Sequence, residues 1–402
     1  RSYSVTGVQT CALPISTQVV ARTADGALSL QAAANEVVAL QLVLAKLGDR
    51  LTNARVSAGD LKGPNGAIGA RNIQMYRLWY VYTSERPPAD VGPGELADAV
   101  TRPSAWHGDA CLPMTEPFDE TFDIPAPDNA VPAQQLQSVW VDVYVPRGTK
   151  AGEYRGELTV HAEQLKDPLR VPVVVEVLPA ELPNRPSWIV ELNSYGRIPG
   201  FAGVNADRQP DRAREALWKY YALGHQHRCE LDALPYSQNW YVESPFYVPV
   251  LDGEGAGTHV ADWSQWDAFM GPMLSGEAFT EEKGYVGPCA GEPISHMYMP
   301  FHENWPIPMS AKHYADYMEC KTRLDFAEWA KKARRVEVAF HDQYKRGFVN
   351  VVREFFEHCA DKGWTKTAFH FYYNNKYYWK VAFFGGMRSE EHTSELQSPN
   401  TI

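Results

Sequence analysis

The chain has 402 residues, a formal net charge of −11 and 45% hydrophobic residues. The acidic balance and the absence of a basic run exclude nucleic acid and anionic membrane surfaces as expected partners, and no apolar run reaches the ~18 residues that a membrane span needs. The hydrophobic fraction is high enough to build real cores, and the length predicts two or more domains.

The two ends of the chain resemble translated sequencing-adapter DNA. Residues 5–15 read VTGVQTCALPI and residues 388–398 read RSEEHTSELQS. These match translations of opposite strands of one adapter oligonucleotide. We therefore expect residues 1–16 and 388–402 to be artefacts flanking a natural protein that is cut at both ends.

Residues 17–180 are predicted to form an antiparallel β-sandwich. Val139, Val141, Val143 and Val145 alternate with larger or polar residues, which is the period of a half-buried strand. Similar strands are predicted over residues 37–44, 75–82, 154–161 and 171–177. Gly- and Pro-rich turns join them, and no helical periodicity interrupts them.

A proline-rich segment over residues 179–186 is predicted to separate this domain from a region of different periodicity. The pattern beyond it alternates strands with helices, which is typical of a parallel α/β region. Strands are predicted at 187–193, 230–234, 296–301 and 367–373, helices at 211–227 and 340–359, and a long insertion at 238–293. About four strands are present where a complete barrel needs eight, so residues 187–387 are predicted to be the first half of a (β/α)8 barrel, truncated after its fourth strand.

The cysteines and histidines do not indicate a metal site. Five cysteines lie between the flanking segments, and they are scattered and lack CxxC spacing, so neither a zinc site nor a disulfide framework is predicted. His225 and His227 are two residues apart, do not share a helix face, and are explained by the favourable interaction of basic groups with a helix C-terminus. We expect no metal and no cofactor.

Polar and aromatic residues follow each predicted strand of the second region. Barrel enzymes carry their sites at these carboxyl ends, so the residues predict a substrate-binding surface. Glu303 leaves an apolar strand beside a tryptophan, which suits a general acid, although it could equally bridge loops or bind a sugar hydroxyl. The candidate substrate-binding residues are Asn193, Tyr195, Tyr236, His302, Asn304, Trp305, Asn374, Asn375 and Lys376.

Several stretches resemble glycoside hydrolase family 123 and related bacterial proteins of unknown function. They are QSVWVDVYVP at 137–146, AGEYRG at 151–156, AANE at 33–36 and FHENWP at 301–306. The resemblance implies a β-sandwich followed by a barrel, a secreted or periplasmic location, and action on glycans that contain N-acetylgalactosamine. It also implies a substrate-assisted retaining mechanism with an adjacent Asp-Glu pair.

No Asp-Glu dipeptide occurs between Pro186 and Met387, so the pair is expected beyond Met387 and the chain is expected to be inactive. The first interpretation is a fragment of a glycoside hydrolase with a glycan substrate. The alternatives are a non-catalytic carbohydrate-binding protein with a degenerate barrel, and a surface scaffold whose sandwich contacts other proteins. The sequence does not predict an oligomeric state.

Overall fold

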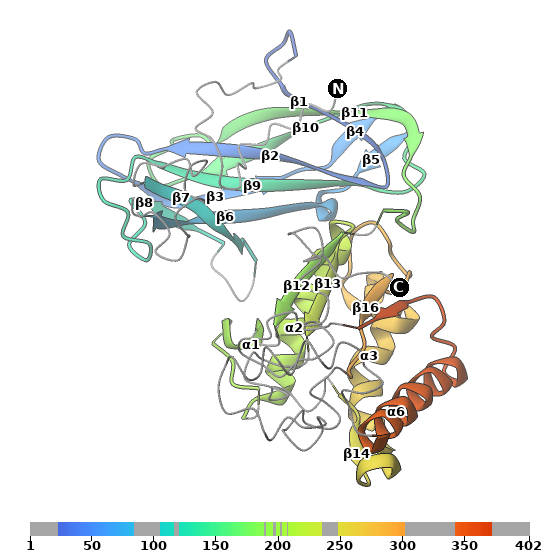
Figure 1. The fold of residues 1–402 in the computed structure, drawn as a ribbon. Helices are drawn as coiled ribbons and strands as arrows, with labels where there is room; N and C mark the ends of the chain where they lie inside the picture. Colours follow the sequence, from blue (N-terminus) through green and yellow to red (C-terminus); the bar gives the residue numbers. More distant parts are fainter. Residues whose placement is uncertain are drawn as a thin grey trace, which may run out of the picture. The chain divides into compact units, whose positions relative to one another are not determined.

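The computed structural model describes residues 23–83, 105–115, 120–188, 190–195, 198–201, 203–206, 208–234, 248–301 and 342–371. The chain divides into two compact units, Arg1–Pro183 and Asn184–Ile402 (Figure 1). The division falls within the proline-rich segment 179–186.

The first unit is built from two β-sheets. The larger sheet has the order β1 (Leu28–Ala34), β11 (Leu169–Glu181), β10 (Gly152–His161), β3 (Leu51–Ala58), β8 (Phe122–Ile124). Beside this path, β4 (Leu61–Gly63) pairs with both β10 and β5 (Gly66–Ile68). The smaller sheet has the order β2 (Glu36–Ala45), β9 (Leu136–Val145), β6 (Ile73–Thr83), β7 (Ala105–Pro113), and the 3-10 turn η1 (Ala70–Asn72) precedes β6. All strand pairs in the two sheets are antiparallel except β1 and β11, which run parallel.

One hydrophobic core fills the first unit. The four alternating valines of β9 are buried, as the period-two pattern predicts. They belong to the same cluster as Tyr154 and Leu158 of β10, which lies in the other sheet. Residues of both sheets therefore bury their apolar faces against each other, and this burial is the main favourable term for the fold of the unit.

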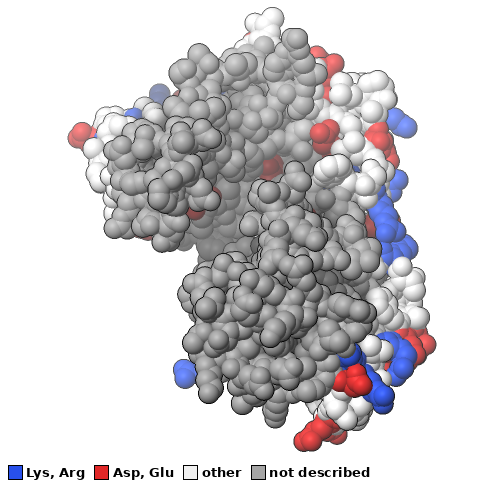
Figure 2. Space-filling model, viewed as in Figure 1, with Lys and Arg blue, Asp and Glu red and all other residues white. Residues whose placement is uncertain are grey.

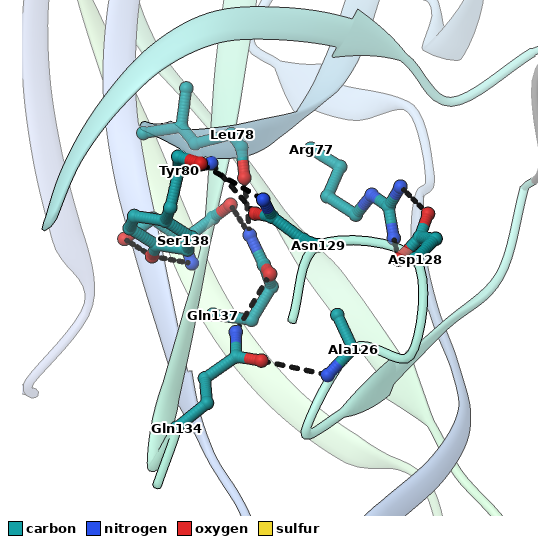
Figure 3. Close-up of polar contacts among 9 residues, drawn as sticks. All are labelled: Arg77, Leu78, Tyr80, Ala126, Asp128, Asn129, Gln134, Gln137 and Ser138. Carbon is teal, nitrogen blue, oxygen red and sulfur yellow. Dashed lines mark hydrogen bonds and ion pairs between the residues drawn. The ribbon is translucent and has the colours of Figure 1, made fainter. Parts of the chain in front are cut away.

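A polar network fastens the loop between β8 and β9 to the smaller sheet (Figure 3). The buried Gln134 accepts a hydrogen bond from the backbone N–H of Ala126 at 2.7 Å. Asn129 accepts from the backbone N–H of Tyr80 at 2.8 Å and donates to its carbonyl at 2.9 Å. The side-chain amides of Gln134 and Asn129 thus form hydrogen bonds with backbone groups that would otherwise need a partner in a neighbouring strand.

The second unit combines parallel strand pairs with helices. β12 (Glu191–Tyr195) pairs with β13 (Glu230–Leu234), and β16 (His296–Tyr298) pairs with β17 (Ala368–His370), both in parallel. The helices are α1 (Ile198–Phe201), α2 (Pro210–Gln226), α3 (Ser264–Ser275) and α6 (Asp342–Asp361). A small antiparallel pair, β14 (Val250–Asp252) and β15 (His259–Asp262), and the 3-10 turns η3 (Gly255–Gly257), η4 (Glu277–Phe279) and η5 (Glu281–Lys283) complete the described part.

Strands and helices alternate along the second unit as the sequence predicts. The helix predicted over 340–359 is found as α6, and Gly363 after it has a φ of 75°, the left-handed conformation that glycine adopts past a helix end. The parallel pairs establish a mixed α/β unit, but the described strands do not show a (β/α)8 barrel.

The first strand of this unit lies later than predicted. Residues 187–193 were expected to form it, whereas β12 begins at Glu191 and includes Tyr195. Val190, directly before β12, accepts a hydrogen bond from the backbone N–H of Glu230 in β13 at 2.8 Å. Further upstream, Asn184 donates to the carbonyl of Ala290 and Arg185 to that of Lys366.

The described part of the predicted insertion over 238–293 contributes to the core. It contains α3, whose Trp266, Phe269 and Met273 are buried together with residues of α2 and α6. Trp266 meets the ring of Phe355 from α6 at 5.4 Å between centroids, in an edge-to-face arrangement. The segment therefore supplies the helix between β13 and β16.

None of the described helices combines the length and the apolar composition required to cross a membrane. Acidic and basic side chains both appear among the described residues on the face drawn in Figure 2.

Candidate functional site

The strands of the second unit carry polar side chains in alternation with apolar ones. Leu231 and Ala233 of β13 belong to the hydrophobic core, and they alternate in sequence with Glu230 and Asp232. Met297 of β16 is likewise a core residue and is flanked by His296 and Tyr298. Successive side chains of a strand point to opposite faces, so one face of these strands packs on the core and the other is polar.

Four of the polar residues converge, one from each parallel strand. We call Glu191 of β12, Asp232 of β13, His296 of β16 and His370 of β17 the carboxylate–histidine cluster. Nε2 of His296 lies 3.1 Å from Oε1 of Glu191, and Nε2 of His370 lies 3.5 Å from the same oxygen. Nε2 of His370 is also 2.7 Å from Oδ2 of Asp232. The cluster thus links residues that are up to 179 positions apart in sequence.

The cluster is held by hydrogen bonds from the surrounding backbone and side chains. Oδ1 of Asp232 accepts from the backbone N–H of Tyr298 at 2.6 Å. Nδ1 of His296 is 2.9 Å from Oγ of Ser295. The ring of Tyr298 meets that of His370 edge to face, with centroids 4.4 Å apart. Side chains whose rotamers are fixed in this way are positioned for chemistry or for ligand binding.

Burial shifts the pKa values of two members of the cluster. Burial raises the pKa of the Glu191 carboxyl, the positive charge of His370 opposes this shift, and the charge of Asp232 adds to it. Burial also lowers the pKa of His296, and this effect is opposed by Asp232 and Glu230 and reinforced by His370. Both shifts favour neutral forms, and perturbed groups of this kind are typical of functional sites.

A second buried carboxylate–histidine pair is formed by residues of α2 and β13. Nδ1 of His225 is 3.6 Å from Oε2 of Glu230, and Nε2 of His225 is 3.0 Å from the carbonyl oxygen of Cys289. Oε1 of Glu230 accepts from the backbone N–H of Ser295 at 2.9 Å. The prediction that helix electrostatics alone explain His225 is therefore incomplete, because its ring is buried and bridges α2 to β13. His227 remains exposed, with Nδ1 2.8 Å from the carbonyl of Leu223.

Three residues of the cluster have the composition of a metal-binding group. One ligand atom each from Glu191, Asp232 and His296 can be chosen so that all lie within 4.8 Å of one another. All four described cysteines are free thiols, and none belongs to this group.

Most of the sequence-predicted site residues lie outside the described residues. This applies to Glu303 and to Tyr236, His302, Asn304, Trp305, Asn374, Asn375 and Lys376. Asn193 and Tyr195 are in β12, where their backbones pair with those of Asp232 and Leu234. The structure thus places Asn193 in register with a member of the carboxylate–histidine cluster, and the convergence of the predicted residues stays a prediction.

The comparison of the sequence with protein families matches the first unit. Residues 16–162 match the model for the glycoside hydrolase 123 N-terminal domain. No curated protein matches the sequence.

Two solved structures resemble the chain at low identity. One is a family 123 glycoside hydrolase from Clostridium perfringens, studied for glycolipid glycan hydrolysis, at 14% identity and a TM-score of 0.47. The match covers 85% of this chain and 54% of that one, so this chain spans about half its length. The other is the CooA pilin subunit from enterotoxigenic Escherichia coli, at 12% identity and a TM-score of 0.21, covering 39% of this chain and 95% of that one. Neither TM-score establishes a common fold.

Proposed function

We propose that this chain, whose residues 16–162 match the model for the glycoside hydrolase 123 N-terminal domain, is part of a glycoside hydrolase. The domain match is the observation that carries the proposal. It is supported by the parallel α/β architecture of the second unit, which is a common scaffold for enzymes.

We further propose that the first unit is the β-sandwich of such an enzyme and that the second is part of its (β/α)8 barrel. The order β12, α2, β13, α3, β16, α6, β17 repeats one strand and one helix, which is the unit from which that barrel is made. The proposed domains are residues 17–180 and 187–387.

The proposed substrates are glycans that contain an N-acetylhexosamine, with N-acetylgalactosaminides first among them. In a substrate-assisted mechanism, the oxygen of the 2-acetamido group attacks the anomeric carbon and the glycosidic bond breaks. One carboxylate orients the acetamido group, and a neighbouring carboxylic acid protonates the departing oxygen. Such enzymes depart from the usual scheme of two separate carboxylates because the substrate supplies the nucleophile.

The absence of an Asp-Glu dipeptide from residues 187–387 leads to a specific expectation for this chain. The pair would lie beyond Met387, and without a general acid the rate should fall by ~10²–10⁴-fold from that loss alone. Glu303 is the candidate acid within the chain, and the polar residues after the strands are the candidate sugar contacts.

The test compares the 402-residue chain with a protein from a longer reading frame of the natural gene. The substrate is 4-nitrophenyl N-acetyl-β-D-galactosaminide, and the matched control is 4-nitrophenyl β-D-galactoside, which lacks the acetamido nucleophile. We expect the longer protein to release nitrophenol from the first substrate only. Release from both substrates would contradict the substrate-assisted mechanism.

Activity of the 402-residue chain itself would contradict an essential pair beyond Met387 and would make Glu303→Gln the decisive variant. The alternative function is carbohydrate binding without catalysis. It predicts saturable binding of N-acetylgalactosamine by the longer protein, measured by calorimetry, with no release of nitrophenol.

A further inference from the structure

We propose that Glu191, Asp232 and His296 bind one divalent transition-metal ion, which ties together the three neighbouring strands β12, β13 and β16. His370 is a positioning residue that holds Asp232 in place. The inference does not depend on glycoside hydrolysis.

The first argument is the position of His296. Its side chain is only 3% exposed, and no hydrogen bond reaches its Nε2, although Oε1 of Glu191 lies 3.1 Å away. When Nδ1 donates its proton to Ser295, Nε2 directs a lone pair into a site lined by carboxylates. When Nε2 carries the proton, a buried donor lacks an aligned acceptor. Either tautomer is costly in a buried site, and a cation between nitrogen and oxygen removes the cost.

The second argument is the spacing of the candidate ligand atoms. Bonds of 2.0–2.1 Å at tetrahedral angles place neighbouring ligand atoms roughly 3.3 Å apart. The His296–Glu191 separation of 3.1 Å is close to this value, and all three candidate ligand atoms lie within 4.8 Å of one another. The His296–Glu191 pair already has the spacing that one ion needs, and the widest of the three separations would have to close by up to about 1.5 Å.

The third argument is charge. Glu191 and Asp232 place two carboxylates in one buried region, and their ion-pair partners among the described residues are histidines, with no lysine or arginine. A divalent cation balances both carboxylates while leaving the imidazole of His296 neutral, which is the form that binds metals.

The ligand types select the class of metal. Calcium and magnesium take oxygen ligands, whereas imidazole nitrogen suits zinc and its neighbours in the first transition row. A set of one imidazole and two carboxylates leaves a fourth position of a tetrahedral ion for water or another ligand. Zinc is therefore the first probe.

The groups around the three ligands have the arrangement that metal sites use. Ser295 contacts Nδ1 of His296 and orients the ring. The backbone N–H of Tyr298 bonds to Oδ1 of Asp232, and His370 contacts Oδ2. Such outer contacts fix ligand orientation and strengthen binding.

The experiment uses the tag-free 402-residue protein, stripped with a chelator and titrated with Zn²⁺ in competition with a chromogenic chelator. Co²⁺ is added in parallel, because its visible absorption distinguishes a four-coordinate site from hydrated ion. We expect one ion per chain and an intense four-coordinate Co²⁺ spectrum that zinc abolishes. Absence of stoichiometric binding by the unaltered protein overturns the proposal, whatever the variants do.

The variants assign the ligands. Glu191→Gln and His296→Ala should each weaken zinc binding by more than the ~10–100-fold expected for His370→Ala, because loss of a ligand costs more than loss of an outer contact. His259→Ala is the matched control, since His259 is exposed and outside the cluster. Loss of binding in the control but not in the cluster variants would overturn the assignment, and circular dichroism verifies that each variant is folded.

Discussion

Replacement of Gln134 by leucine should destabilise the first unit although the new side chain is apolar and similar in size. Gln134 is 4% exposed and makes three hydrogen bonds. Its Oε1 accepts from the N–H of Ala126 at 2.7 Å, and its Nε2 donates to the carbonyl of Leu136 at 3.0 Å and to Oε1 of Gln137 at 3.2 Å. The side chain thus completes the backbone hydrogen bonding of the loop drawn in Figure 3.

The size of the destabilisation follows from the hydrogen-bonding groups that lose their partner in the variant. An unpaired buried N–H at Ala126 costs about 1–3 kcal/mol, and each of the other two bonds contributes about 0.5–1.5 kcal/mol. The additional buried methyl surface of leucine offsets about 1 kcal/mol of this sum. The free energy of unfolding should therefore fall by about 1–5 kcal/mol.

The assay is urea denaturation of the full chain followed by circular dichroism, with hydrogen exchange of the 126–137 peptide to localise the effect. Gln135→Leu is the matched control, because Gln135 is the adjacent residue, is exposed, and its side chain donates to the carbonyl of Ala133. The control should change stability by less than about 0.5 kcal/mol. Equal effects of the two substitutions, or unchanged exchange in the 126–137 peptide, would refute the reasoning.

Two further predictions concern the second unit and the thiols. Trp266→Ala should cost about 3–5 kcal/mol because the indole is fully buried, whereas Trp188→Ala, at a residue 79% exposed, should be close to neutral in the same denaturation assay. Burial raises the pKa of Cys289 to about 11 and that of Cys359 to about 12, so both thiols should stay protonated near pH 8. Peptide mass spectrometry after iodoacetamide treatment of the native protein should find the exposed Cys111 modified before Cys289 and Cys359, and rapid labelling of Cys359 would contradict its burial.

The sequence predicts strands and helices best where one periodicity runs unbroken. The alternation at Val139–Val145 places β9 correctly, and the apolar spacing before Gly363 places α6 within two residues at each end. α3 is missed because Gly271 and Pro272 interrupt an otherwise helical spacing. Tertiary packing overrides this interruption. A Cβ at Gly271 would stand 2.9 Å from the ring of Trp364, so the glycine permits a close contact between α3 and that ring.

The carboxylate–histidine cluster is harder to predict because its members lie within strands. A search of the residues that follow each strand finds Glu303 and its neighbours but passes over Asp232 and His296. The available signal is local: charged or imidazole side chains at alternate positions of short apolar strands. That signal identifies a polar face, but only the parallel pairing shows that these residues meet.

The parallel pairing of β1 with β11 has a mechanical consequence. These are the first and last strands in the described part of their unit, and the register runs from Leu28 opposite Val173 to Ala34 opposite Glu181. A pull on the chain before Leu28 and after Glu181 therefore acts at opposite ends of the pair. The backbone bonds between the two strands are then loaded together in shear instead of being opened one at a time, so tension applied across the unit is shared by all of them.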